Sequence, residues 1–372
     1  MAILTLNQLK AAVATYVDDN KISVNSFSAT YNNAVGLLDT ISKIFTIPSN
    51  YVDKLEAFDG EELSFGKTIE EWKSDLKLME DYVSAGTGAL SKFPVTYRPV
   101  SFSFTLGRKY VPVSIENNDI ERAVHNEAQF AEIIADKYKV MEDSAKVYRY
   151  AMKRQALAVL AARCIHDMTP SNATQFSTSG TYAVGALLVE TANTAPVYIC
   201  FKPYTSGDAA SFAAAVAAGY LVKLELVTEL AKPVDTSTGE AFITQVKEDV
   251  EIASDNSQGH SLNGNCLGAV EGLKLLLLQG VRPVLDVAVE AGAFHMEKVA
   301  IPADIIALPD FGNDSNSVYG ILMDSRGMRL HNTYRAVREN VNGQGDWLTL
   351  FFHVEYTCHV SRNTFVKVYK PA

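Results

Sequence analysis

The chain has 372 residues, of which 48% are hydrophobic and 20% are charged, and its formal net charge at pH 7 is −10. This length allows two domains, or one domain with a large extension. The negative balance and the lack of any run rich in Lys or Arg argue against a surface that binds nucleic acid.

The first 57 residues mix weak helical periodicity with Asn- and Ser-rich breaks, as in DDNKISVNSFSATYNN. They predict an extended arm. The opening residues MAILTLNQLKAAVATYV lack a basic leader and predict no signal peptide. The most apolar window elsewhere, GLKLLLLQGV, is too short to span a bilayer, so no membrane partner is expected.

The stretch FDGEELSFGKTIEEW, from Phe58 to Trp72, resembles a phosphate-binding loop but fails its spacing. That motif needs four residues between its glycines, whereas five separate Gly60 from Gly66. Two of the five are Glu61 and Glu62, whose charges would repel a phosphate. The sequence therefore predicts no nucleotide cofactor.

A hairpin is expected next. The chain becomes extended from about Glu61, and VSFSFTLG, Val100 to Gly107, alternates strictly between apolar and polar residues, which predicts a strand with one buried face. A polar, charged stretch with two glycines, TIEEWKSDLKLMEDYVSAGTGAL, lies between the two extended arms. Two strands joined by so long a charged excursion indicate a protruding hairpin.

The strongest helical pattern follows, from about Glu127 to Ala162. Neither Pro nor Gly occurs from Asn117 to Thr169, so one helix of roughly 50 Å is permitted at 1.5 Å per residue. Its apolar residues recur every three or four positions and form one stripe. They are Phe130, Ile134, Tyr138, Met141, Ala145, Tyr148 and Met152.

Short strands and helices are expected from there to about residue 310. They include the alanine-rich helix DAASFAAAVAAG, capped by Ser206 or Asp208 and ended by Gly219. The C-terminal part is strand-rich, in VYGILMDSRGMRLHN, WLTLFFHVEYTCHV and NTFVKVY. One face of the middle strand is apolar: Leu348, Leu350, Phe352, Val354, Tyr356, Cys358 and Val360.

Candidate chemical sites fail on geometry. His353, Glu355 and His359 share the other face of that strand, but at about 3.3 Å per residue the two histidines lie roughly 20 Å apart, too far to share an ion. Ser261 lies in GHSLNG, which has one residue too many for a nucleophile elbow. His166-Asp167 fits a helix end. Four distant cysteines indicate reduced, mostly buried thiols of a cytoplasmic product. No catalytic, cofactor-binding or metal-binding residue is predicted.

The order of these elements, an arm, a charged hairpin, a long helix, a mixed region and returning strands, resembles the major capsid proteins of tailed bacteriophages, which share the Hong Kong 97 phage fold. Four segments also resemble capsid proteins of small short-tailed phages (podoviruses). They are FGKTIEEWKSDL, NNDIERAVHNEAQFAEII, LDVAVEAGAFHM and the closing strands from GILMDSRGMRLHN to NTFVKVY. The similarity covers roughly residues 60–160 and 270–370.

The resemblance implies an α+β fold of five parts. They are an N-terminal arm (1–57), an extended loop called the E-loop (58–115), a peripheral domain with the spine helix (116–175), an axial domain (176–309) and return strands completing the peripheral domain (310–372). It implies that the E-loop contacts a neighbouring subunit through Lys67, Glu70, Glu71, Trp72, Lys73, Asp75 and Lys77.

The function implied is that of a major capsid protein, without enzymatic activity, which self-assembles as hexamers and pentamers into the icosahedral head shell of the virion. Its partners would be itself, scaffolding and portal proteins, and enclosed DNA that is bound without sequence specificity. The protein would be made in the host cytoplasm. Two alternatives stay open: a soluble hydrolase that uses Ser261 or a metal, and another virion protein such as a tail component.

Overall fold

The computed structural model describes residues 51–63, 69–74, 97–101, 103–105, 107–116, 127–255, 257–265, 272–292, 301, 303–312, 317–342 and 347–372. The predicted arm falls almost wholly outside this part. The chain divides into two compact units. One comprises Met1–Asn50, Ser114–Val140 and Val341–Leu348, and the other comprises Tyr51–Val113, Met141–Asn340 and Thr349–Ala372.

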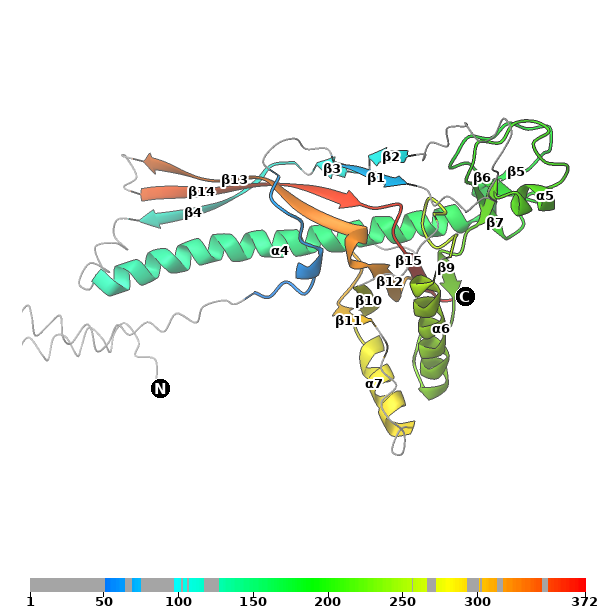
Figure 1. Ribbon diagram of the computed structural model, residues 1–372. Helices are drawn as coiled ribbons and strands as arrows, with labels where there is room; N and C mark the ends of the chain where they lie inside the picture. Colours follow the sequence, from blue (N-terminus) through cyan, green and yellow to red (C-terminus); the bar gives the residue numbers. More distant parts are fainter. Residues whose placement is uncertain are drawn as a thin grey trace, which may run out of the picture. The chain divides into compact units, whose positions relative to one another are not determined.

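The long helix is present as α4, Glu127–Met168 (Figure 1). It begins at the predicted residue and ends after the predicted Ala162. Within the second unit, Met141 and Ala145 of the predicted stripe are buried. Tyr138, by contrast, is 42% exposed, so the stripe does not bury every predicted position. Further along, α4 contributes Leu157, Leu160, Ala161 and Cys164 to the core, because three- and four-residue spacing keeps them on one face.

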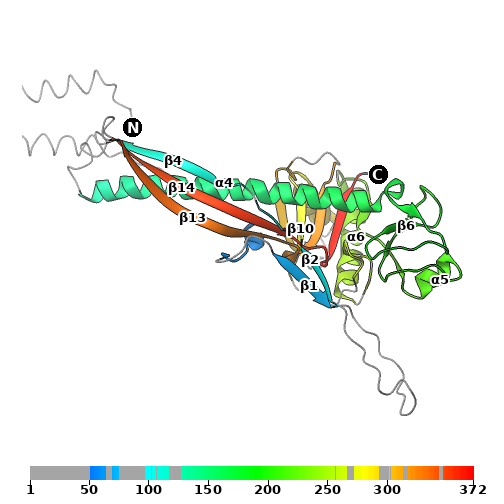
Figure 2. The ribbon, with the colours of Figure 1, turned by 90° about the horizontal axis from the view of Figure 1, so that it is seen from above.

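The strand-rich C-terminal region forms a sheet that follows α4 within the second unit (Figures 1 and 2). Its order is β13-β14-β3, and β4 also pairs with β14. The strands are β3 (Ser103–Thr105), β4 (Lys109–Glu116), β13 (Met328–Asn342) and β14 (Trp347–Val360). The predicted apolar face of β14 is confirmed, because the residues from Leu350 to Cys358 on that face are at most 5% exposed.

The predicted hairpin is present as β1 (Glu70–Ser74) paired antiparallel with β2 (Tyr97–Ser101). Residues 75–96 between the strands lie outside the described part. The single strand predicted from Val100 to Gly107 is wrong, because it is divided between two sheets. β2 pairs with β1, whereas β3 pairs with β14. Alternation predicts extended backbone but does not determine the partner strand.

A mixed five-stranded sheet carries the largest core. Its order is β11-β10-β12-β15-β9, with β10–β11 and β15–β9 parallel. The strands are β9 (Val227–Glu229), β10 (Leu273–Leu278), β11 (Asp304–Leu308), β12 (Gly320–Asp324) and β15 (Val366–Lys370). The apolar run LKLLLL is the β10 strand, in which Leu275, Leu276 and Leu277 are fully buried.

Two helices complete this core: α6 (Thr236–Ser254) and α7 (Val281–Gly292). Phe242 and Val246 of α6 pack with Val281 and Leu285 of α7. An Asp235–Thr238 capping box begins α6.

A smaller mixed sheet, ordered β5-β6-β7-β8, has its own core around Leu188 and Tyr204. Its elements are β5 (Thr174–Gln175), β6 (Leu187–Val189), β7 (Val197–Cys200), β8 (Leu221–Lys223) and the helix α5 (Phe212–Ala217). Short 3₁₀ helices lie at η2 (Glu56–Phe58), η4 (Pro170–Asn172) and η5 (Ser325–Gly327).

The predicted cap of α5 is wrong. Ser211, not Ser206 or Asp208, is the N-cap, and its hydroxyl accepts a hydrogen bond from the Ala214 amide at 3.1 Å. Asp208 instead accepts from the Thr205 amide in the preceding turn. Gly219 follows the helix with φ +71°, as expected of a residue that ends a helix.

Cys164, Cys200 and Cys358 are free and buried, as predicted, and burial raises the pKa of the Cys358 thiol to about 12. Cys266 lies outside the described residues.

Among the helices of the described part, none combines the length and the apolar composition that crossing a membrane requires.

Two glycines with φ +91° allow a matched test of the loop that follows α6. A Cβ at Gly259 would lie 2.0 Å from the Lys223 carbonyl oxygen, whereas a Cβ at Gly207 would meet nothing within 4 Å. We expect Gly207→Ala to lower the free energy of unfolding by only about 1–2 kcal/mol, from backbone strain. Gly259→Ala should cost more, because the backbone must also move. Urea unfolding measures both, and equal losses would contradict the placement of the 257–265 loop.

Candidate subunit-interface site

The predicted E-loop residues are only partly described. Lys67, Asp75 and Lys77 lie outside the described residues. Trp72 and Lys73 pair with Pro99 and Arg98 in the β1–β2 register, which places their backbone in the hairpin. Glu70 is exposed, while the side chain of Glu71 is only 24% exposed. The two neighbouring carboxylates thus lie in different environments, because successive strand residues point to opposite faces.

Glu71 is held by residues of its own chain at the end of β14. Ser361 Oγ donates a hydrogen bond to Glu71 Oε1 at 2.8 Å, and His359 Nε2 lies 3.4 Å from Glu71 Oε2. The Asn363 backbone amide in turn donates a hydrogen bond to Ser361 Oγ at 3.1 Å. We call Glu71, His359, Ser361 and Asn363 the Glu71 junction. The last three are each at most 7% exposed, so the junction is almost closed to water.

The charge of Glu71 is stabilised by these contacts. Burial of its carboxyl raises the pKa, but the contacts from His359 and Ser361 favour the ionised form. The hydrogen bonds outweigh the burial, and the pKa of Glu71 lies below its ordinary value of 4.5. A carboxylate that stays charged in this partly buried site is a structural element of the hairpin base.

A second ionic cluster joins α4 to residues 53–59. The Lys153 side chain is fully buried, and its ammonium contacts Asp53 Oδ2 at 2.7 Å, the Leu55 carbonyl oxygen at 2.9 Å and the Asp59 carboxylate. Arg149, one turn earlier, also pairs with Asp59. We call these residues the Lys153 cluster. The sequence reasoning missed it, because a lysine beside an apolar stripe looks like a surface residue.

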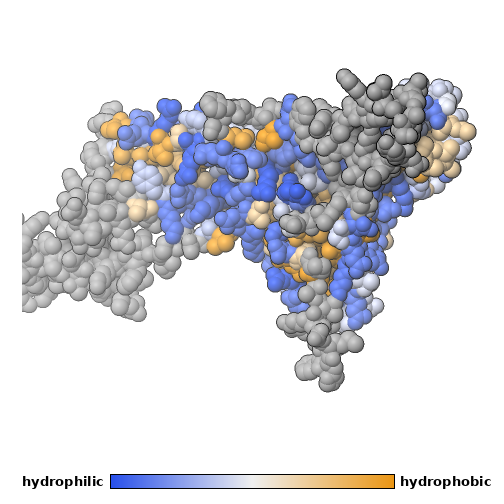
Figure 3. Space-filling view, in the orientation of Figure 1, coloured by the Kyte–Doolittle hydropathy of each residue, from blue (hydrophilic) through white to orange (hydrophobic). Residues whose placement is uncertain are grey.

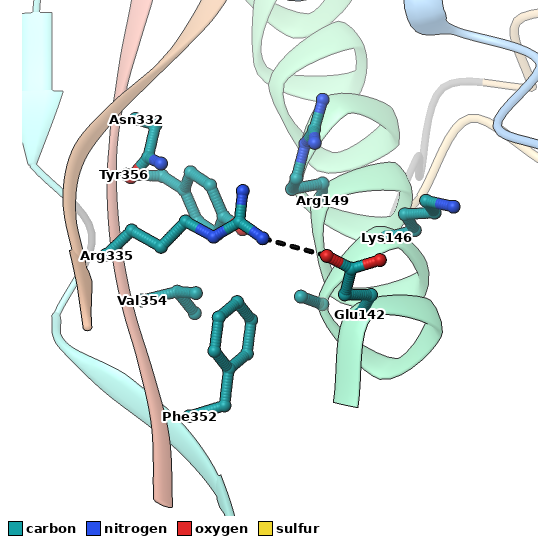
Figure 4. A pocket seen from close by; sticks show the side chains of 9 residues that line it. Glu142, Lys146, Arg149, Asn332, Arg335, Phe352, Val354 and Tyr356 are labelled. Atoms are coloured by element: carbon teal, nitrogen blue, oxygen red, sulfur yellow. Dashed lines mark hydrogen bonds and ion pairs between the residues drawn. The ribbon is translucent and has the colours of Figure 1, made fainter. Parts of the chain in front are cut away.

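A shallow groove lies between α4 and the β13–β14 strands (Figure 4). Glu142 of α4 accepts a hydrogen bond from Arg335 of β13 at 2.9 Å across it, and the Arg335 guanidinium lies over the Phe352 ring. Its volume of about 130 Å³ is below the roughly 300–1,000 Å³ of most small-molecule sites. Hydrophilic residues cover much of the described surface along α4 in Figure 3. This surface suits polar contacts better than an enclosed ligand.

On the other face of β14 the three predicted ligand candidates contact different partners. Glu355 is 3% exposed and accepts from Arg108 Nε at 3.2 Å, while His359 faces Glu71 and His353 lies beside Tyr110. Among the described residues no group of three potential ligands comes together. Glu355 and His359 are buried, so this face is closed to solvent at these two positions.

Ser261 is fully buried and its hydroxyl accepts a hydrogen bond from the Asn265 amide at 3.0 Å. The neighbouring His260 stacks on Phe365, and its Nε2 lies 3.7 Å from Glu225 rather than toward Ser261 Oγ. Burial and the charge of Lys367 lower the pKa of His260, so the ring is neutral in the folded chain near neutral pH. Ser261 therefore serves to shape the loop.

At the C-terminal end of α4, Asp167 is 1% exposed. Its Oδ2 accepts a hydrogen bond from Arg163 Nε at 3.0 Å, and its Oδ1 lies 3.0 Å from His166 Nδ1. His166 lies in the last turn, where the helix dipole favours a positive charge, as predicted.

Comparison with known proteins gives one family model that matches part of the chain, and solved structures that share its fold. Residues 252–366 match the family model for the Phi29-like phage major capsid protein. That segment runs from the C-terminal end of α6 through β14 to the first residue of β15, and so includes much of the five-stranded sheet. None of the curated protein sequences compared with the chain matches it.

Two solved structures share the fold. A chain from the capsid structure of Staphylococcus phage Andhra has a TM-score of 0.56 at 10% identity, with 88% of this chain and 87% of that chain covered. A chain from the structure of the head fiber and inner core protein of native bacteriophage P68 has a TM-score of 0.53 at 10% identity, with 89% and 88% covered. The α+β fold is therefore of the Hong Kong 97 phage capsid type.

A first prediction concerns the Lys153 cluster. Lys153→Met keeps much of the side-chain volume but leaves Asp53 without its buried partner, so the free energy of unfolding should fall by about 3 kcal/mol or more. The control is Lys223→Met, because the Lys223 side chain is 52% exposed and its pair with Glu225 should contribute at most about 1 kcal/mol. Equal losses in urea unfolding would show that the cluster is not a buried ion pair.

A second prediction concerns pH. Because the folded pKa of Glu71 is below the unfolded value, its contribution to stability is fully present above about pH 4.5 and is lost as the pH falls through the folded pKa. Glu71→Gln should therefore destabilise the protein by about 1–2 kcal/mol at pH 7, with a difference from wild type that shrinks toward pH 3. A difference that stays constant or grows on acidification would contradict the assignment.

The matching segment and the shared fold together show a phage major capsid protein, a structural component that forms the shell of the virion head.

Proposed function

We propose that copies of this chain assemble as hexamers and pentamers into a closed icosahedral head shell, in which the β1–β2 hairpin carries the E-loop to a neighbouring subunit. The observation that supports this most directly is the hairpin itself. Its two strands pair with each other, and its base is held by the Glu71 junction. The 22 residues 75–96 between the strands are more than a simple turn requires, since Ser74 and Tyr97 already lie opposite each other.

In this proposal the chain has the five parts expected from the resemblance: arm (1–57), E-loop (58–115), peripheral domain with spine helix (116–175), axial domain (176–309) and return strands (310–372). The candidate contacts with a neighbour are Lys67, Glu70, Trp72, Lys73, Asp75 and Lys77. Glu71 belonged to the same candidate set, but its carboxylate contacts its own chain, so we assign it to the hairpin base.

Scaffolding and portal proteins are the further partners we propose, and DNA is enclosed without sequence-specific contacts. The net charge of −10 supports the last point, because a strongly attractive lining would hold the genome by its phosphates. The chain's own subunit contacts can be individually weak, since closure of a shell makes many of them act together.

The register of the hairpin provides a sharp test. Residues 75–96 can be replaced by Asn-Gly, a two-residue type I′ turn that joins Ser74 directly to Tyr97 without changing the β1–β2 pairing. We expect this variant to fold with the wild-type circular dichroism spectrum and a melting temperature within a few degrees, but to form no closed shells.

Two controls separate assembly from folding. Wild-type protein carried through the same protocol shows whether the conditions support assembly, and Gly207→Ala shows whether a change remote from the hairpin disturbs it. Normal shells from the Asn-Gly variant in electron microscopy and sedimentation would refute the E-loop assignment. An unfolded variant would show that residues 75–96 belong to the core.

A further inference from the structure

The β1–β2 hairpin is linked to the rest of the second unit through the start of β1. It forms a two-stranded sheet of its own, separate from the three larger sheets. Just before β1, the Ile69 amide donates a hydrogen bond to Ser103 Oγ at 2.9 Å. The Glu71 carboxylate adds contacts to Ser361 and His359. Because an isolated two-stranded hairpin is only marginally stable, such contacts help to hold it in place.

The far side of the Glu71 junction continues into another loop. Asn363 Oδ1 accepts hydrogen bonds from the side-chain amides of Asn263, at 2.8 Å, and Asn265. The Asn263 amide in turn donates to the Arg362 carbonyl oxygen at 3.0 Å. Asn265 and Asn363 are 2% and 4% exposed, so water competes little for these bonds.

The loop reached in this way, residues 257–265, is attached to the five-stranded sheet. The Gly259 carbonyl oxygen accepts from the Glu225 amide at 2.9 Å, and the His260 carbonyl oxygen accepts from the Val366 amide of β15 at 3.0 Å. An unbroken series of polar contacts therefore leads from the hairpin base to the sheet that carries α6 and α7. These elements are far apart in the sequence, and the series joins them through buried groups.

The structure assigns Glu71 a role as a positioning residue: its carboxylate fixes the β1–β2 hairpin to the Ser361–Asn363 turn and, through Asn363, couples the hairpin to the 257–265 loop. Loss of the carboxylate then loosens both the hairpin and the loop. Its consequence for shell assembly rests on the proposed function, but the coupling within the subunit does not.

The geometry requires a carboxylate at position 71. Two acceptor oxygens are met by separate donors, Ser361 Oγ on Oε1 and His359 Nε2 on Oε2. An alanine would leave these buried donors unpaired, and a glutamine would place an amide group against one of them.

The test uses the unassembled, full-length subunit and hydrogen–deuterium exchange. In Glu71→Ala we expect exchange of the β1 amides, Glu70–Ser74, to accelerate about tenfold or more, together with that of the loop amides from Ser261 to Asn265. Helix α4 from Leu157 to Cys164 should be unchanged. Glu70→Ala is the matched control, because Glu70 is exposed on the same strand, and it should leave exchange of both segments unaltered.

Each other outcome would overturn the proposal. Unchanged exchange at β1 would show that Glu71 does not position the hairpin, and faster exchange at β1 alone would show that the coupling to the loop is absent. If Glu71→Ala fails to fold, Glu71→Gln is measured instead, with the same two segments as the readout. The failure of wild-type protein to form shells would count against the proposed function only, because the exchange measurements do not require assembly.

Discussion

The buried ammonium of Lys153 holds the short segment around η2 against helix α4. A charged group with no exposed side-chain surface is tolerated only with close partners, and here two carboxylates and a carbonyl oxygen surround it. Those partners come from the short segment around η2, which therefore must lie against α4. The same segment reaches β13, since the Gly60 amide donates to the Leu330 carbonyl oxygen at 2.9 Å and Arg329 Nη1 donates to the Asp59 carbonyl oxygen at 3.0 Å. The Lys153 cation thus fixes the position of the backbone segment that leads to the hairpin.

The same principle holds in the rest of the second unit. Buried polar groups there determine which residues pair with each other, which hydrophobic burial alone does not determine. Apolar packing accounts for the five-stranded sheet and for the apolar face of β14, but hydrophobic contacts are not directional. The Glu71 junction and the Asp249 contacts are directional. Tyr369 donates to Asp249 Oδ2 at 2.7 Å between β15 and α6, and Lys367 lies 3.4 Å from the other oxygen. For a subunit that must present the same surface to every neighbour, such directional contacts are an advantage.

The parts of the fold with local periodicity could be predicted from the sequence. The three- and four-residue spacing from Phe130 onward gave the position of α4, and alternation from Leu348 to Val360 gave β14 and its buried face. Contacts between distant residues could not be predicted. Lys153 and Asp53 are 100 positions apart, and Ser361 and Glu71 are 290 apart, so no window of sequence contains both partners. The division of Val100–Gly107 between two sheets was missed for the same reason, since the partner strand β14 lies far along the chain. The capsid function came from the order of elements, because no single motif carries chemistry.

Electron microscopy of the purified full-length protein, with sedimentation velocity on the same sample, shows directly whether this chain is a self-assembling shell subunit. We expect monomers or small capsomers at low concentration that convert into closed hollow particles of uniform diameter as the concentration rises or a scaffolding partner is supplied. A single small oligomer that persists at every concentration, with and without such a partner, would contradict it.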